Sequence, residues 1–351
     1  MRAVVFKGPW KIVVEDRPVP KIEKPTDVIL KVSKTALCGS DLHYYRGHGV
    51  PRRLDFICGH EIVGYISELG ADVKNFMVGD HVVLPFHTAC AECYYCKRGE
   101  SSRCSKCEQF GDGVEGCIDG GQSEYIRVPQ AATTLVHAPQ AVPEEVLVLM
   151  ADIFPTGYLA ASRFLKDLPE QLLEDMTVAV IGCGPVGICA LTCAMYLTGG
   201  RGKFFAIDSV SKRLKEAERI GATPLALSDD PVRTIQAATD GRGADVVLEI
   251  VGHSDALQLA LDIIRPWGKV SSVGVHGSQL SISGPQLHAK NATLAFGCCP
   301  VRSLFEDALA VLAATQDKVK FLCGSVMPLE SAPEAFALFE QRKVHKVIFA
   351  P

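Results

Sequence analysis

The alternation of apolar and polar positions changes its character near residue 150. Before that point, short runs rich in Val and Ile are separated by Gly and Pro, as at 27–32, 61–68 and 81–84. Such runs predict the strands and turns of an all-β unit. Residues 1–10 alternate apolar and polar side chains and show no long apolar run of the kind that precedes an export cleavage site, so a first strand is expected there.

From about residue 154 the chain instead alternates apolar strands with helices. Strands are expected at 177–181, 203–207, 244–250 and 269–273, and helices at 185–197 and 211–220. This order predicts an α/β domain with a parallel, doubly wound sheet. After about residue 295, a helix at 303–315 and a last pair of strands ending at 347–350 are expected to rejoin the first domain. The predicted domains are therefore 1–153 with 297–351, and 154–296.

Length, charge and cysteine content narrow the class of protein. A chain of 351 residues exceeds the ~250–300 residues that one core supports. The net charge is −4 and no basic block is present, which favours a small-molecule partner over nucleic acid or a membrane. Fourteen cysteines without an export signal favour the cytoplasm and thiolate metal ligands. The apolar stretch 178–197 raises a membrane-spanning alternative, but glycines and a proline interrupt it.

A glycine-rich turn follows the first expected strand of the second domain. Its residues are Gly182, Cys183, Gly184, Pro185, Val186 and Gly187. Gly-x-Gly-x-x-Gly between a strand and a helix binds the pyrophosphate of a dinucleotide. Asp208 ends the next strand, where an acidic residue accepts the ribose hydroxyls and disfavours NADP, so NAD is predicted. Two alternatives stay open: Asp208 caps the helix near Ser211, or the nearby Lys212 and Arg213 admit NADP.

Four cysteines at short spacing predict a closed metal site. Cys90, Cys93, Cys96 and Cys104 form C-x2-C-x2-C-x7-C in a loop at about 86–110. Four thiolates complete a tetrahedral zinc shell and leave no open position, which indicates a structural zinc. An iron–sulfur cluster is the alternative. Cys107 and Cys117 lie nearby without an assigned role.

A second group of metal-binding residue types lies in the same β-rich domain. Cys38 and His60 are suitable zinc ligands, but two ligands do not make a site. Taken singly, Cys38 could be a small buried apolar residue, and His60 could be a core histidine. The residues alone leave this site incomplete.

Taken together, the motifs resemble those of the zinc-containing medium-chain alcohol dehydrogenases. C-G-S-D-x-H at 38–43, G-H-E at 59–61, the four-cysteine loop and the glycine turn occur in that family's order over essentially the whole chain. The resemblance implies a GroES-like catalytic domain and a Rossmann cofactor domain. It also implies that Asp152 is the third catalytic zinc ligand, as in the formaldehyde, threonine and polyol dehydrogenase branches, with Glu61 able to ligate when water is displaced.

The same resemblance implies roles for further residues. Ser40 passes on the proton of the alcohol and His43 relays it towards solvent, while zinc acts as a Lewis acid and hydride moves to NAD. Thr156 and the backbone at Val273 and Val275 bind the nicotinamide, and Phe86 lines the substrate pocket. Arg213 is a cofactor-site candidate for a different reason, its closeness in sequence to Asp208. The alternatives are that Asp152 caps a helix near Pro155, Ser40 satisfies a turn, and His43 is merely exposed.

The predicted function is reversible alcohol oxidation by NAD with two zinc ions per chain, one catalytic and one structural. A reductase of C=N or C=C bonds in specialised metabolism, and a non-enzymatic sensor of the nicotinamide redox state, are the alternatives. The segments 43–56 and 108–121 are expected to contact the substrate, but their side chains do not indicate which alcohol binds. A homodimer or homotetramer, paired through the strand at 293–298, is implied by the resemblance.

Overall fold

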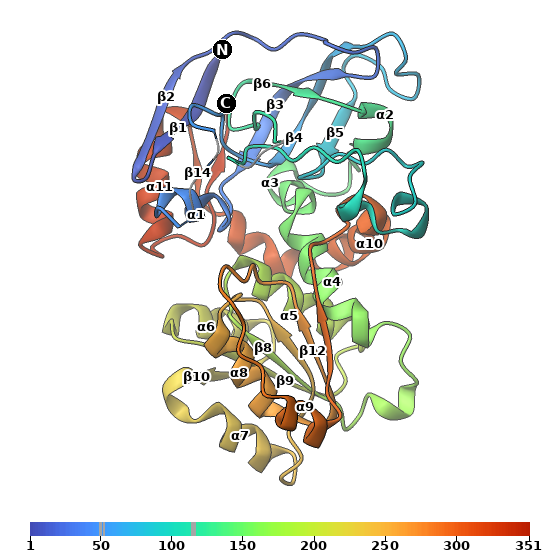
Figure 1. Ribbon diagram of the computed structural model, residues 1–351, viewed down its shortest axis with the longest axis vertical. Helices are drawn as coiled ribbons and strands as arrows, with labels where there is room; N and C mark the ends of the chain where they lie inside the picture. The colour runs from blue at the N-terminus through green and yellow to red at the C-terminus, as the bar shows by residue number, and fades with distance from the viewer. Residues whose placement is uncertain (49–50, 52, 114–116) are drawn as a thin grey trace. The chain divides into compact units, whose positions relative to one another are not determined.

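The computed structural model describes residues 1–48, 51, 53–113 and 117–351 (Figure 1). Parts of the predicted pocket segments 43–56 and 108–121 thus lie outside the described residues. The chain forms two compact units, Met1–Pro155 with Pro300–Pro351, and Thr156–Cys299. The sequence places the corresponding boundaries at 153/154 and 296/297.

The first unit is built mainly from antiparallel strands, as its Val- and Ile-rich runs separated by turns predict. Its larger sheet has the order β14-β15-β3-β4-β5-β7, with β6 also paired to β3, and β1 and β2 form a separate hairpin. The strands are β1 Arg2–Gly8, β2 Lys11–Asp16, β3 Val28–Ala36, β4 Glu61–Leu69, β5 His81–Leu84, β6 Tyr125–Val128, β7 Val136–His137, β14 Val326–Met327 and β15 Ile348–Phe349.

Short helices connect these strands, and two longer ones come from the C-terminal part of the chain. They are α1 Asp41–Tyr45, α2 Ala131–Thr134, α3 Glu144–Leu147, α10 Val301–Val319 and α11 Ala332–Glu340. Phe336 of α11 and Phe349 of β15 are fully buried in one core with Phe6 of β1. Ile348 pairs with Ala36 of β3. The strand β15 is therefore part of the sheet that contains β3 and β4, next to the predicted zinc ligands Cys38 and Glu61.

The second unit contains a six-stranded sheet in the order β10-β9-β8-β11-β12-β13, and every pair in it is parallel. The predicted doubly wound α/β fold is confirmed. The strands are β8 Thr177–Ile181, β9 Lys203–Asp208, β10 Thr223–Ala226, β11 Ala244–Glu249, β12 Ile264–Ser272 and β13 Thr293–Phe296. The helices are α4 Ile153–Leu165, which crosses the boundary, α5 Pro185–Leu197, α6 Ser211–Arg219, α7 Pro231–Ala238, α8 Ser254–Ile263 and α9 Gly284–Lys290.

Alternate residues of the parallel strands face different helices. Ala179 and Val247 lie in one core with Ile235 of α7 and Leu261 of α8. Val180, the neighbour of Ala179 in β8, faces α5 instead, since a methyl group added to Gly187 of α5 would lie 3.8 Å from Val180 Cγ1. Both faces of the strands are therefore covered, which explains why the sequence of β8 is apolar throughout.

Residues 178–197, for which a membrane span was the alternative, form most of the strand β8, a turn and the buried helix α5. Among the described residues, no single helix is long and apolar enough to cross a bilayer. One pair of helical segments, Glu144–Ala151 and Ile153–Leu165, passes the length and composition test together, but a 57° bend separates its members.

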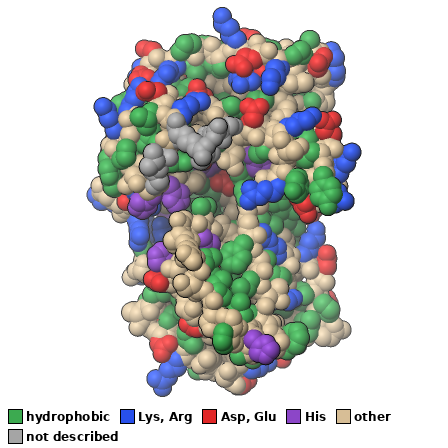
Figure 2. All heavy atoms as spheres, in the orientation of Figure 1, with side chains coloured by type: hydrophobic (Ala, Val, Ile, Leu, Met, Phe, Trp, Pro, Cys, Tyr) green, Lys and Arg blue, Asp and Glu red, His purple; other side chains and the backbone are tan. Residues whose placement is uncertain are grey.

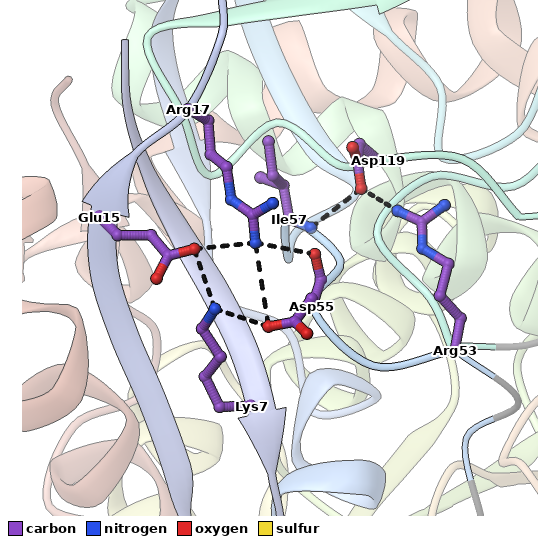
Figure 3. A network of polar contacts seen from close by, with 7 residues as sticks. All are labelled: Lys7, Glu15, Arg17, Arg53, Asp55, Ile57 and Asp119. Atoms are coloured by element: carbon purple, nitrogen blue, oxygen red, sulfur yellow. Dashed lines mark hydrogen bonds and ion pairs between the residues drawn. The ribbon is translucent and has the colours of Figure 1, made fainter.

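A polar network attaches the β1–β2 hairpin to the segment that leads to the first candidate site (Figure 3). Lys7 donates to Glu15 at 2.9 Å and to Asp55 at 2.5 Å, and Arg17 pairs with Glu15 at 2.8 Å. The hydrogen bond from Lys7 lowers the pKa of the Asp55 carboxyl. Two other residues of the same segment bind Asp119, which comes from a later part of the chain. The backbone N–H of Ile57 donates to Asp119 Oδ1 at 3.0 Å, and the side chain of Arg53 pairs with the same oxygen.

Charges of both signs are interspersed over the face shown in Figure 2. This distribution agrees with the small net charge of −4 from 36 Lys and Arg and 40 Asp and Glu. A field of this kind fits the predicted small-molecule partner better than a polyanion.

Candidate active site

The first candidate site brings together four predicted residues from three segments that are far apart in the sequence. The ligand atoms of Cys38, His60, Glu61 and Asp152 all lie within 4.8 Å of one another. Asp152 Oδ2 is 3.5 Å from Cys38 Sγ and 3.5 Å from His60 Nε2. Cys38 follows β3, Glu61 begins β4, and Asp152 lies between a short 3-10 helix and α4. The carboxylate of Asp152 therefore points towards the other donors.

Asp41 orients two of these donors, although sequence reasoning did not single it out. Its Oδ2 accepts a hydrogen bond from the backbone N–H of Cys38 at 2.9 Å. Its Oδ1 lies 3.5 Å from His60 Nδ1, so the Nε2 of His60 is turned towards Asp152. A carboxylate on the second ring nitrogen is the arrangement that fixes the tautomer of a metal-binding histidine. The sequence feature that could have pointed to Asp41 is an acidic residue three positions after Cys38.

A buried lysine neutralises Glu61. Lys346 Nζ lies 2.7 Å from Glu61 Oε1 and donates to the carbonyl of Leu37 at 3.3 Å, and both charged side chains are almost fully buried. Burial is the largest influence and lowers the pKa of Lys346, but the charges of Glu61, Cys38 and Asp152 and the hydrogen bond to Glu61 together outweigh it and raise the pKa. Burial raises the pKa of Glu61, and Lys346 opposes that rise. The sequence signal was a lone lysine in the apolar run 344–350.

Electrostatics around the donors indicate what the cluster requires. Burial, followed by the charges of Glu61 and Asp152, raises the pKa of the Cys38 thiol. Burial lowers the pKa of His60, but Asp41, Asp152 and Cys38 together raise it well above its ordinary value. Both groups thus hold protons that a cation would replace. One sulfur, one imidazole nitrogen and carboxylate oxygens form a donor set that fits zinc.

The predicted proton-relay residues lie beside this cluster. Ser40 Oγ is 3.3 Å from His60 Nε2, and Ser40 precedes α1 without a side-chain capping bond. His43 is partly buried rather than fully exposed. Burial and then the charges of Arg46 and His48 lower its pKa. The backbone N–H of His43 donates to the carbonyl of Ser40 at 3.1 Å.

A pocket in the first unit reaches two of these residues. Ser40 and His60 line it together with Tyr44, Phe56 and Asp112. Burial and then Asp112 raise the pKa of the Tyr44 phenol to about 12, so it stays a hydrogen-bond donor at neutral pH. Tyr44 was missed at the sequence level because nothing in its local pattern distinguishes it from a core aromatic residue.

Phe86, the predicted substrate-pocket residue, packs on the metal-site histidine. The two ring centroids are 6.3 Å apart in an edge-on arrangement. Its backbone N–H donates to the carbonyl of Ala151, next to Asp152, at 3.1 Å. Phe86 is thus beside the cluster, although it does not line the pocket described above.

The four predicted lobe cysteines form a separate cluster. The sulfur atoms of Cys90, Cys93, Cys96 and Cys104 lie within 4.8 Å of one another. Backbone N–H groups of Cys96 and then Ser105 lower the pKa of Cys93 to about 5. Four sulfurs at this spacing fit a closed tetrahedral metal shell.

The glycine turn has the geometry that its pattern predicts. Gly182 has φ +91°, and Gly184 is the N-cap of α5, with Pro185 and Val186 in its first turn. Because only the short turn 182–184 separates the helix from the strand, the free N–H groups of its first turn lie at the carboxyl edge of the sheet.

Asp208 is buried at the end of β9 and supports this turn. Its Oδ2 accepts from the backbone of Cys183 at 2.8 Å, and Arg213 lies 3.6 Å from the same oxygen. The alternative role of Asp208 as the cap of α6 is wrong, because Val210 is the N-cap and no side chain caps the helix. Thr156 lies in the first turn of α4, and Val273 to Val275 directly follow β12.

Comparisons with known proteins agree over the whole chain. Residues 24–140 match the alcohol dehydrogenase GroES-like domain, and residues 185–314 match the zinc-binding dehydrogenase domain. A zinc-type alcohol dehydrogenase B of Aspergillus flavus is 47% identical over 99% of this chain and 81% of that protein. Sorbitol dehydrogenase of Bacillus subtilis is 30% identical over 100% of this chain and 97% of its own length.

Solved structures give the same result. The alcohol dehydrogenase of Thermus sp. ATN1 superposes with a TM-score of 0.91 at 34% identity, covering 100% of this chain and 99% of that one.

These similarities and the donor cluster define an oxidoreductase enzyme of the zinc-dependent alcohol dehydrogenase class. The chain belongs to the medium-chain dehydrogenase/reductase family, with its GroES-like and Rossmann domains. The resemblance stated from the motifs is confirmed. A reductase of C=N or C=C bonds is not favoured, and the similarity to dehydrogenases supports an enzyme over the non-enzymatic sensor.

Proposed function

We propose that this enzyme interconverts an alcohol and its aldehyde or ketone with NAD, using one catalytic and one structural zinc per chain. The observation that carries the proposal is the gathering of Cys38, His60, Glu61 and Asp152 around one point, apart from the four lobe cysteines. A mixed set that includes a carboxylate suits a catalytic zinc with an exchangeable position, whereas four thiolates suit a structural one.

The side chains of the chain divide the work of the reaction. Cys38, His60 and Asp152 hold the zinc, which supplies Lewis acidity to the alcohol oxygen when bound. Ser40, exposed and 3.3 Å from His60 Nε2, takes the proton of the alcohol, and His43 passes it to solvent. Glu61, held by Lys346, is the further carboxylate that can ligate during exchange. Phe86 restricts the space beside His60.

The second unit binds the cofactor. Gly182, Gly184, Pro185, Val186 and Gly187 receive the pyrophosphate at the N-terminus of α5, and Asp208 and Arg213 receive the adenosine ribose. Thr156 and the backbone at Val273 and Val275 receive the nicotinamide. The carboxylate of Asp208, buried 2.8 Å from the Cys183 N–H, repels a 2′-phosphate and favours NAD over NADP.

Metal analysis and turnover together test this proposal. The purified enzyme is expected to contain two zinc ions per chain and to reduce NAD with some member of a panel of alcohols and polyols, followed by NADH absorbance. Chelation is expected to remove activity, and loss of the lobe zinc in a Cys93→Ser variant is expected to lower the melting temperature. Intact enzyme with a full zinc complement and no turnover on any alcohol or carbonyl compound would contradict the proposal.

Replacement of Asp208 tests cofactor choice. Asp208→Asn removes the negative charge and keeps one of the two oxygens that accept from the N–H groups of Cys183 and Val210, each at 2.8 Å. We expect the ratio of kcat/KM for NAD over NADP to fall by about 10- to 100-fold, corresponding to ~1.4–2.7 kcal/mol of charge repulsion. Asp229→Asn, on the exposed surface of the same unit, is the control. An unchanged ratio would remove Asp208 from the specificity role.

Assembly and location complete the proposal. β13 is an edge strand of the six-stranded sheet, which supports pairing of two cofactor domains into a homodimer or homotetramer through this strand. Light scattering would measure the mass of the assembly. Reduced thiolates as metal ligands support a cytoplasmic location.

A further inference from the structure

A buried carboxylate at the end of β11 connects two turns of the cofactor domain. Glu249 is fully buried, and its Oε1 accepts from the backbone N–H groups of Val251 and Gly252, each at 2.8 Å. Its Oε2 accepts from Ser272 Oγ at 2.6 Å and lies 3.2 Å from His276 Nε2. One side chain therefore binds the turn after β11 on one oxygen and the segment after β12 on the other.

The two segments are in direct backbone contact at this point. A methyl group on Gly274 would lie 2.1 Å from the nitrogen of Gly252, and one on Gly252 would lie 2.6 Å from the nitrogen of Val275. Val273 also donates its backbone N–H to the carbonyl of Glu249 at 3.1 Å. Only glycine allows this approach, so the position of Val273 to Val275 depends directly on the turn that Glu249 holds.

The pattern of donors assigns the protons of the cluster. Ser272 has one hydroxyl proton and gives it to Glu249, so its oxygen accepts from His276, whose Nε2 is 2.9 Å away. The side chain of His276 is only 10% exposed, and its ring meets Phe296 edge-on with centroids 5.6 Å apart. Among the residues that the structure describes, the buried Nδ1 of His276 has no hydrogen-bond partner. The contacts of Nε2 therefore hold the ring in place, while Nδ1 can still form a hydrogen bond.

The cluster lies where a parallel sheet binds its ligand. Glu249 and Ser272 are the last residues of neighbouring strands, and dinucleotides bind outside the carboxyl ends of such strands. The proposed function assigns the nicotinamide contact to the backbone at Val273 and Val275. Because that contact uses main-chain groups, its geometry depends on what holds the main chain.

We propose that Glu249, Ser272 and His276 are positioning residues that hold the Val273–Val275 backbone in the conformation that receives the nicotinamide. This inference rests on the proposed use of NAD. Backbone donors and acceptors bind a ligand best when they need not reorganise. The cluster supplies that order through three hydrogen bonds to one buried carboxylate, the approach of His276 to the same carboxylate at 3.2 Å, and the serine–histidine hydrogen bond.

Binding of two ligands separates this role from a general structural one. NADH carries a nicotinamide, whereas ADP-ribose has the same adenosine and pyrophosphate without it. For Glu249→Gln and His276→Ala, titration calorimetry is expected to show the Kd of NADH raised about 10-fold, the effect of losing about one hydrogen bond. The Kd of ADP-ribose is expected to stay within about twofold, since the glycine turn and Asp208 are unchanged.

Two further variants sharpen the comparison. His276→Gln retains an amide N–H near the position of Nε2 and is expected to recover most of the NADH affinity that His276→Ala loses. His288→Ala replaces an exposed histidine of α9 in the same unit and is expected to change neither Kd. Equal weakening of both ligands, or unchanged NADH binding, would overturn the positioning role. Wild-type protein that binds neither ligand would instead overturn the proposed use of NAD itself.

Discussion

Replacing Cys38 with Ser is expected to lower kcat/KM for the alcohol by at least about 1,000-fold while leaving the fold intact. The variant lacks the thiolate of Cys38, which is the strongest protein donor to zinc. Zinc binding is therefore lost, and with it the Lewis acidity on which the reaction depends. The Cys38 sulfur lies 3.5 Å from Asp152, and the serine oxygen occupies a similar volume. Steady-state rates and the zinc content per chain are the measurements, and the zinc content is expected to fall from two to one.

A cysteine outside both clusters provides the matched control. Cys193 is fully buried in α5, and its replacement by Ala is expected to retain both zinc ions and most of the activity. Full turnover in the Cys38→Ser enzyme with one zinc per chain would show that this cluster is not the catalytic centre. Circular dichroism of each variant verifies that activity is compared between folded proteins.

Replacing Lys346 with Met is expected to destabilise the first unit by about 3–5 kcal/mol, because it leaves a buried carboxylate without its partner. Glu61 is fully buried and lies 2.7 Å from the ammonium group. The midpoint and slope of urea unfolding, followed by fluorescence and far-UV circular dichroism, give the change in stability.

Two variants make this expectation specific. Lys343→Met removes a lysine on the exposed part of the same C-terminal segment and is expected to change stability by less than about 0.5 kcal/mol. Adding Glu61→Gln to Lys346→Met removes the unpaired charge and is expected to restore a large part of the loss. A Lys346→Met protein as stable as the wild type would show that the ion pair contributes little.

The arrangement of the second unit was predictable because its pattern is local. The strand β8 is buried along its whole length and largely apolar, and α5 begins at Pro185 directly after the glycine turn, so α5 has the predicted bounds 185–197. The strand β12 was predicted too short. It begins at Ile264, but Trp267, at φ +62°, and a register shift interrupt its pattern before Lys269. A local irregularity of this kind hides a strand from periodicity.

The metal clusters were predictable to different degrees. The lobe cysteines lie within 15 residues of one another, so their spacing alone defines the set. Cys38, His60 and Asp152 come from distant segments, and Asp152 was found only through a family resemblance. Asp41 lies against His60, Lys346 pairs with Glu61, and Tyr44 lines the same pocket as His60. The spacing of Asp41 and the apolar surroundings of Lys346 were signals, but neither signal indicated the partner.

The sequence by itself determined the two kinds of domain, the glycine turn and the donor types, because each follows from neighbouring residues and from the chemistry of their side chains. Only the tertiary structure decided which distant charges meet: Lys346 with Glu61, Asp41 with His60, and Glu249 with Ser272 and His276. The physical reason is that a buried charge must find a partner within a few ångströms, and the folded backbone, not distance along the chain, determines which partner is available.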